Sequence, residues 1–79
     1  MIEQILHRYE DIEIIKADGF NDAIIGIDCE NVRLVYSITK ALEILQKHMD
    51  EEEAAEFFEF NVRQAYFGAK TPIWVEDNF

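Results

Sequence analysis

Hydrophobic residues near the N-terminus recur at a helical spacing. Four of them fall at positions i, i+3, i+4 and i+7, namely Ile2, Ile5, Leu6 and Tyr9. This spacing places them on one face of a short helix. The next segment, residues 11–17, carries three isoleucines and is compatible with either a strand or a continued helix. We expect this segment to be extended.

The middle of the chain has the composition of a β-hairpin. Asp18 and Gly19 begin a turn-forming stretch, since glycine tolerates positive φ and an aspartate side chain accepts hydrogen bonds from nearby backbone donors. Residues 23–28 and 32–37 are rich in β-branched side chains, and only residues 29–31 separate them. Such a short link predicts two antiparallel strands.

Two helices are predicted after the hairpin. From residue 38 the apolar period becomes helical, which predicts a helix over about residues 39–49. Asp50 and Glu53 have the spacing of a capping box, and the intervening glutamates suit the positive end of the helix dipole. The second helix should therefore begin at Asp50 and continue to about residue 67.

The helical pattern stops before a last strand. Gly68 suits the left-handed residue that follows a helix, and Pro72 prevents the helix from resuming. Residues 71–75 then predict a strand. The whole pattern predicts an α+β fold, in which the hairpin and the C-terminal strand form a small antiparallel sheet covered on one face by two or three helices. The length of 79 residues predicts a single domain, residues 1–79.

Charge restricts the classes of partner. Seventeen acidic residues against seven basic ones give a net charge of −10, while 49% of the residues are hydrophobic, which is typical of a folded domain. An acidic surface repels the phosphates of nucleic acids and anionic membranes. A protein partner with a basic surface, by contrast, would be attracted.

The candidate metal ligands and targeting signals are sparse. Cys29 is the only cysteine, so no internal disulfide or thiolate cluster can form. His7 and His48 lie far apart in the sequence, and we expect neither a metal nor another cofactor. The apolar stretches are shorter than the roughly 20 residues that span a bilayer, and residues 1–4 do not resemble an export signal. We therefore expect a cytoplasmic protein.

The predicted helix over residues 50–67 carries two aromatic residues away from its apolar face. At about 100° per residue, six residues should contact the core: Ala54, Phe57, Phe58, Asn61, Val62 and Ala65. Phe60 and Phe67 fall instead on the flank beside an acidic stripe. Either the C-terminal segment, including Trp74 and Phe79, folds over both rings, or the rings form a patch for a partner with a basic and apolar surface. The candidate partner-binding residues are Phe60, Phe67, Glu53 and Glu56.

No catalytic motif is recognisable in the sequence. The carboxylates of residues 50–53 fit a capped and solvated helix start better than a cation site or an acid–base pair, because nothing supplies the burial that separates acid from base. Cys29 falls in the predicted hairpin loop, with no histidine nearby in sequence to activate it. Asn61 should hydrogen-bond to a loop backbone. We expect a binding protein and not an enzyme.

Several short motifs resemble those of a family of small uncharacterised acidic phage proteins. They are DGFNDAIIG at residues 18–26, RLVYS at 33–37, EFNV at 59–62 followed by AY and glycine, and TPI at 71–73. The resemblance covers most of the chain and implies a viral origin and the cytoplasm of a host cell. It transfers no functional residues.

Two functions follow as expectations from the resemblance and the charge. Small acidic phage proteins often disable host enzymes by occupying basic surfaces, so the first expectation is an accessory protein that inhibits or regulates a host protein. The alternative is a virion or assembly component that associates with itself, for example as a homodimer.

Overall fold

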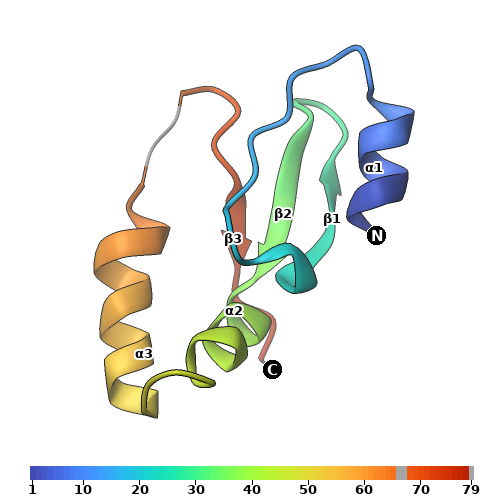
Figure 1. The fold of residues 1–79 in the computed structure, drawn as a ribbon. Coiled ribbons are helices and arrows are strands. Elements are labelled where there is room, and N and C mark those ends of the chain that lie inside the picture. Colours follow the sequence, from blue (N-terminus) through green and yellow to red (C-terminus); the bar gives the residue numbers. More distant parts are fainter. Residues whose placement is uncertain (66–67, 79) are drawn as a thin grey trace.

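A three-stranded mixed sheet lies at the centre of the computed structural model, which describes residues 1–65 and 68–78. The strands are β1 (Ile24–Asp28), β2 (Arg33–Ser37) and β3 (Ile73–Val75), and the α-helices are α1 (Ile2–Arg8), α2 (Ile38–Leu45) and α3 (Glu51–Phe57). Figure 1 shows α1 beside β1 at one edge of the sheet and α3 on the side of β3, with α2 beyond the end of β2. This arrangement confirms the predicted α+β class.

The orientation of the last strand differs from the sequence-based expectation. β1 and β2 form the predicted antiparallel hairpin, with Asp28 opposite Arg33. β3 pairs with β2 in parallel, with Val35 opposite Ile73, so the expectation of a wholly antiparallel sheet is wrong. After α2, α3 runs back beside the sheet, toward the end where β2 begins (Figure 1). The chain therefore enters β3 in the direction of β2.

The N-terminal segments contact the sheet through side chains. α1 lies where the apolar spacing predicts it and buries Ile5, while Leu6 is exposed. Residues 13–17 form neither helix nor strand. The backbone N–H of Ala17 donates a hydrogen bond to the phenolic oxygen of Tyr36, at 2.9 Å. A side chain of the sheet, and not strand pairing, therefore holds the end of this segment.

α2 has a clear start and an early end. The Oγ of Ser37 accepts a hydrogen bond from the backbone N–H of Lys40 at 3.0 Å, which caps the helix. The helix ends at Leu45, whose carbonyl accepts from the N–H of His48 in a tighter turn. The predicted continuation to about residue 49 is therefore wrong.

α3 changes its helical geometry part-way along the predicted segment. Asp50 Oδ1 accepts from the backbone N–H of Glu53 at 2.8 Å, which confirms the predicted N-cap. After Phe57 the chain continues as a π-helix over Phe58–Arg63, in which hydrogen bonds join residues i and i+5. The wider turn rotates less per residue than an α-helix, so a wheel of constant angle fails here. Beyond it, Gly68 has a φ of 91°, the predicted left-handed conformation.

The core is organised around the ring of Trp74 on β3. This ring lies 4.7 Å from that of Tyr36 and makes edge contacts with Phe58 at 5.1 Å and Phe20 at 5.7 Å, measured between ring centroids. Tyr36 and Trp74 are register partners on adjacent strands, so they share one face of the sheet. That face is covered by Phe58, from the helical segment, and by Phe20, from the segment before β1.

Candidate partner-binding surface

Two phenylalanine rings are exposed on α3 and the π-helix that follows it. Phe60 is 72% exposed and Phe57 is 42% exposed. Both line a shallow hollow of about 380 Å³, together with the side chains of Glu53 and Glu56. We call these four residues, Glu53, Glu56, Phe57 and Phe60, the α3 patch. The structure therefore brings together three of the candidate residues, Phe60, Glu53 and Glu56, while Phe67 lies outside the described residues.

The C-terminal segment does not cover Phe60. Phe60 is largely exposed, and Trp74 packs instead against Phe20, Tyr36 and Phe58 inside the fold. The other residue that was expected to cover it, Phe79, lies outside the described residues. Of the two alternatives left open by the sequence, burial of Phe60 under this segment is therefore wrong. An exposed ring beside carboxylates is the arrangement that the structure contains.

The buried and exposed residues of α3 and the π-helix differ in part from those that the helical wheel predicts. Ala54 and Phe58 are buried as the wheel predicts, but Phe57 and Asn61 are exposed, so their predicted core positions are wrong. The side chain of Asn61 makes no hydrogen bond with the residues at 1–65 and 68–78, and its predicted bond to a loop backbone is absent there. Adjacent rings on an α-helix point about 100° apart. The pair Phe57–Phe58 was therefore a signal that one ring would leave the core.

The carboxylates of the α3 patch repel each other. The Asp50 carboxylate raises the pKa of Glu53 above its ordinary value, both by accepting a hydrogen bond from the protonated form and by its charge, and Glu56 adds to the repulsion. Glu59 is neutralised by an ion pair with Arg63 at 3.3 Å. Within the described part of the chain, Glu53 and Glu56 have no such cation. A cationic group from outside would therefore lower the electrostatic free energy of this patch.

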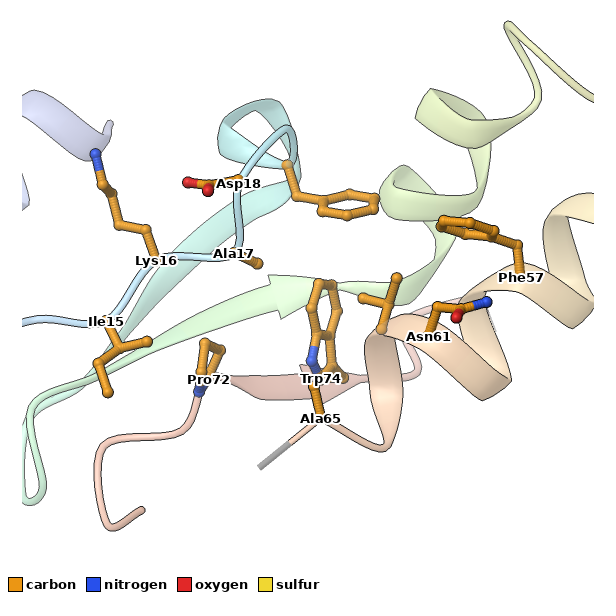
Figure 2. Close-up of a pocket in the computed structure, with 11 residues that line it drawn as sticks. Ile15, Lys16, Ala17, Asp18, Phe57, Asn61, Ala65, Pro72 and Trp74 are labelled. Atoms are coloured by element: carbon orange, nitrogen blue, oxygen red, sulfur yellow. The ribbon is translucent and has the colours of Figure 1, made fainter. Parts of the chain in front are cut away.

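A second hollow lies on the other side of Phe57 and Asn61. It has a volume of about 400 Å³ and a mainly apolar lining. We call it the Trp74 groove, and its lining includes Ile15, Ala17, Phe57, Asn61, Val62 and Trp74. Figure 2 shows the indole of Trp74 between the segment around Ala17 and the side chains of Phe57 and Asn61. Sequence reasoning did not find this groove, because its two walls are distant in the sequence.

Other chemistry is sparse on the described surface. Cys29 is exposed, and no group of three or more histidine, cysteine or carboxylate side chains in residues 1–65 and 68–78 is arranged to hold a metal ion. Burial raises the pKa of the Tyr36 hydroxyl, the hydrogen bond from the Ala17 N–H opposes this effect, and the negative charge of Asp18 adds to it.

None of the helices in the described ranges is long and apolar enough to cross a bilayer.

Comparison of the chain with protein-family models, with curated proteins and with solved structures gave no match. The function is therefore inferred from the geometry and charge of the described residues.

Proposed function

We propose that this protein is a small acidic accessory protein that binds a protein partner with a basic surface through the α3 patch. The observation that carries the proposal is the 72% exposure of Phe60 beside two carboxylates that have no ion pair within residues 1–65 and 68–78. The resemblance of the sequence motifs to phage proteins favours a host protein as the partner. Binding would then inhibit or regulate that protein.

The two kinds of side chain in the α3 patch have separate roles. Burying an aromatic ring at the centre of an interface typically contributes about 1–3 kcal/mol, and aromatic residues are enriched among such hot spots. Phe60 is the anchor in this proposal. Glu53 and Glu56 attract basic groups over long distances, which accelerates encounter and excludes acidic partners. A capped helix supports the patch, so little ordering entropy is lost on binding.

The same charges argue against self-association through this surface. A two-fold interface centred on Phe60 would place Glu53 and Glu56 of one copy near the same residues of the other. Like charges in a desolvated interface are unfavourable, and the chain already carries a net charge of −10. The charge pattern therefore favours a basic partner over a second copy of this chain, which is the alternative function.

Affinity capture from a host-cell lysate, with matched variants, tests the proposal. Wild-type protein should retain a partner at low salt and lose it at high salt, because salt screens exposed charges. Phe60→Ala should lose the partner at low salt as well. Leu6→Ala is the control, since Leu6 is another exposed apolar residue and lies on α1 at the opposite edge of the sheet (Figure 1). Retention by Phe60→Ala equal to that of the control would contradict the proposal.

Sedimentation velocity distinguishes the proposed function from the alternative, a self-associating assembly component. A monomer at all protein concentrations is expected near neutral pH. A dimer that dissociates on Phe60→Ala but not on Leu6→Ala would instead favour the self-associating assembly component.

A further inference from the structure

The α3 patch and the Trp74 groove are two parts of one continuous surface. Phe57 and Asn61 line both hollows, so a ligand that covers Phe60 has only this ridge to cross before it reaches the groove. The exposed amide of Asn61 lies on the ridge and makes no hydrogen bond with any residue in the described ranges. It can therefore bond to the backbone of a polypeptide that crosses the ridge.

We propose that the Trp74 groove is the second subsite of this surface and takes one bulky apolar side chain of the basic polypeptide segment that covers Phe60. This proposal rests on the proposed function and adds the chemistry of the bound segment. The groove has a volume of about 400 Å³, near the lower end of the roughly 300–1,000 Å³ found for ligand sites. The groove is large enough to admit a bulky side chain, and its mainly apolar lining favours an apolar one.

Charge determines what flanks the apolar side chain. At one end of the surface lie Glu53 and Glu56, and Asp18 lies on the far rim of the groove. None of these three carboxylates has an ion pair with a residue described by the structure. Lys16 is also on the far rim, and the side chains of both Lys16 and Asp18 extend away from Trp74 (Figure 2), so their charges offset each other on this rim. The bound segment therefore carries lysine or arginine on the side of its apolar residue that faces Glu53 and Glu56, and a second copy of this acidic chain is a poor occupant.

Trp74 provides a direct readout, because it is the only tryptophan in the chain. Random peptides without tryptophan would be selected for binding to the wild-type protein at low salt. We expect the enriched peptides to combine basic residues with one bulky apolar residue, and to shift the fluorescence emission of Trp74 at saturation. Replacing the apolar residue of the peptide by alanine should weaken binding about tenfold and remove the emission shift.

Variants separate the groove from the α3 patch. Ile15→Lys places a cation in the groove at a residue that does not pack against the buried core, and it should weaken binding of the enriched peptides about tenfold. Ile12→Lys is the matched control, since Ile12 is exposed on the same segment and does not line the groove. Phe60→Ala should also weaken binding about tenfold. It should, however, leave the emission shift intact at saturation.

Three outcomes would count against these inferences. Peptides that depend on Phe60 but are insensitive to Ile15→Lys and leave the Trp74 emission unchanged would overturn the subsite while the proposed function stands. Peptides that enter the groove without basic residues would overturn the basic occupant. No enrichment, or enrichment that is insensitive to both salt and Phe60→Ala, would overturn the proposed function and the subsite together.

Discussion

The backbone N–H of Ala17 donates a hydrogen bond to the hydroxyl oxygen of Tyr36 at 2.9 Å, across a sequence separation of 19 residues. Tyr36 has no exposed surface, and its ring stacks at a tilt on that of Trp74. The hydroxyl therefore fixes the segment around Ala17, which forms one wall of the Trp74 groove, relative to the ring of Trp74.

Tyr36→Phe should release this wall without removing the ring. The Ala17 N–H would lose its acceptor, and we expect a loss of about 0.5–1.5 kcal/mol in the free energy of unfolding. Amide hydrogen exchange at Ala17 should accelerate more than exchange in β1. Unchanged exchange at Ala17 would show that the hydrogen bond does not hold this segment.

The pH dependence of the same residue has a defined sign. Burial raises the pKa of Tyr36 in the folded protein, and the hydrogen bond from Ala17 only partly opposes the rise. The contribution of Tyr36 is therefore fully present below the unfolded pKa of about 10 and is lost as pH rises through the folded value. Wild-type stability, measured by urea unfolding, should fall over this alkaline range more steeply than that of Tyr36→Phe. Parallel curves would contradict the burial effect.

Val32 in the hairpin loop has a φ of 53°, a left-handed conformation that is unfavourable for a β-branched residue. Val32→Gly should relieve it and raise the free energy of unfolding by about 0.5–1 kcal/mol, after the larger entropy of glycine in the unfolded chain is subtracted. This corresponds to a rise of roughly 2–8 °C in Tm. Val32→Ala is the control, because it keeps a Cβ atom at the same φ. An equal gain from alanine would place the effect in the side chain and not in the backbone.

Asp28 stabilises the two ends of the same loop. Its carboxylate accepts hydrogen bonds from the side chains of Asn31 and Arg33 and from the backbone N–H of Glu30. The Asn31 bond is the largest cause that lowers the pKa of Asp28, a slight burial opposes it, and the Glu30 and Arg33 bonds reinforce it.

The stabilising effect of Asp28 is therefore present above the unfolded pKa of about 3.9 and is lost as pH falls through the lower folded value. Asp28→Asn should be less stable than wild type at neutral pH, and the difference should shrink on acidification. Urea unfolding at several pH values measures this difference. Glu13→Gln, at an exposed position on another segment, is the control and should show no comparable convergence. A constant difference for Asp28→Asn would contradict the role of its charge.

Phe58 and Phe60 should have different roles, the first in the stability of the fold and the second in binding. Phe58 is 2% exposed and contacts Trp74, so Phe58→Ala should cost about 3–5 kcal/mol and unfold much of so small a domain. Phe60→Ala should change the free energy of unfolding by less than about 0.5 kcal/mol. Thermal melts of both variants provide the comparison. A strongly destabilised Phe60→Ala would mean that this ring supports the fold and is not an interface anchor.

The local features of this fold were predictable from sequence, whereas the long-range ones were not. The hairpin and the Asp50 cap depend on residues within a few positions of each other, and both were predicted correctly. The parallel orientation of β3 depends on the end of the sheet at which the chain arrives after α3. No local sequence pattern encodes that position. Phe57 and Phe58 point about 100° apart on the helix, and the wheel did not show which of the two rings would enter the core. Asn61 lies in the π-helix, whose geometry a wheel of constant angle cannot represent. The wheel placed Phe60 on the flank of the helix, but it did not show whether another segment would cover the ring.

The parallel pairing of β2 with β3 also orders the folding reaction. The β1–β2 hairpin closes a short loop, whereas Val35 meets Ile73 only after a long intervening chain has been ordered, at a greater loss of entropy. Contacts between distant residues form slowly for this reason. The late strand carries Trp74, so we expect the aromatic core to close last, with Phe58 of the π-helix packing against Trp74 in the same step. A partner that holds α3 in its docked position would therefore act chiefly by slowing the unfolding rate of the protein.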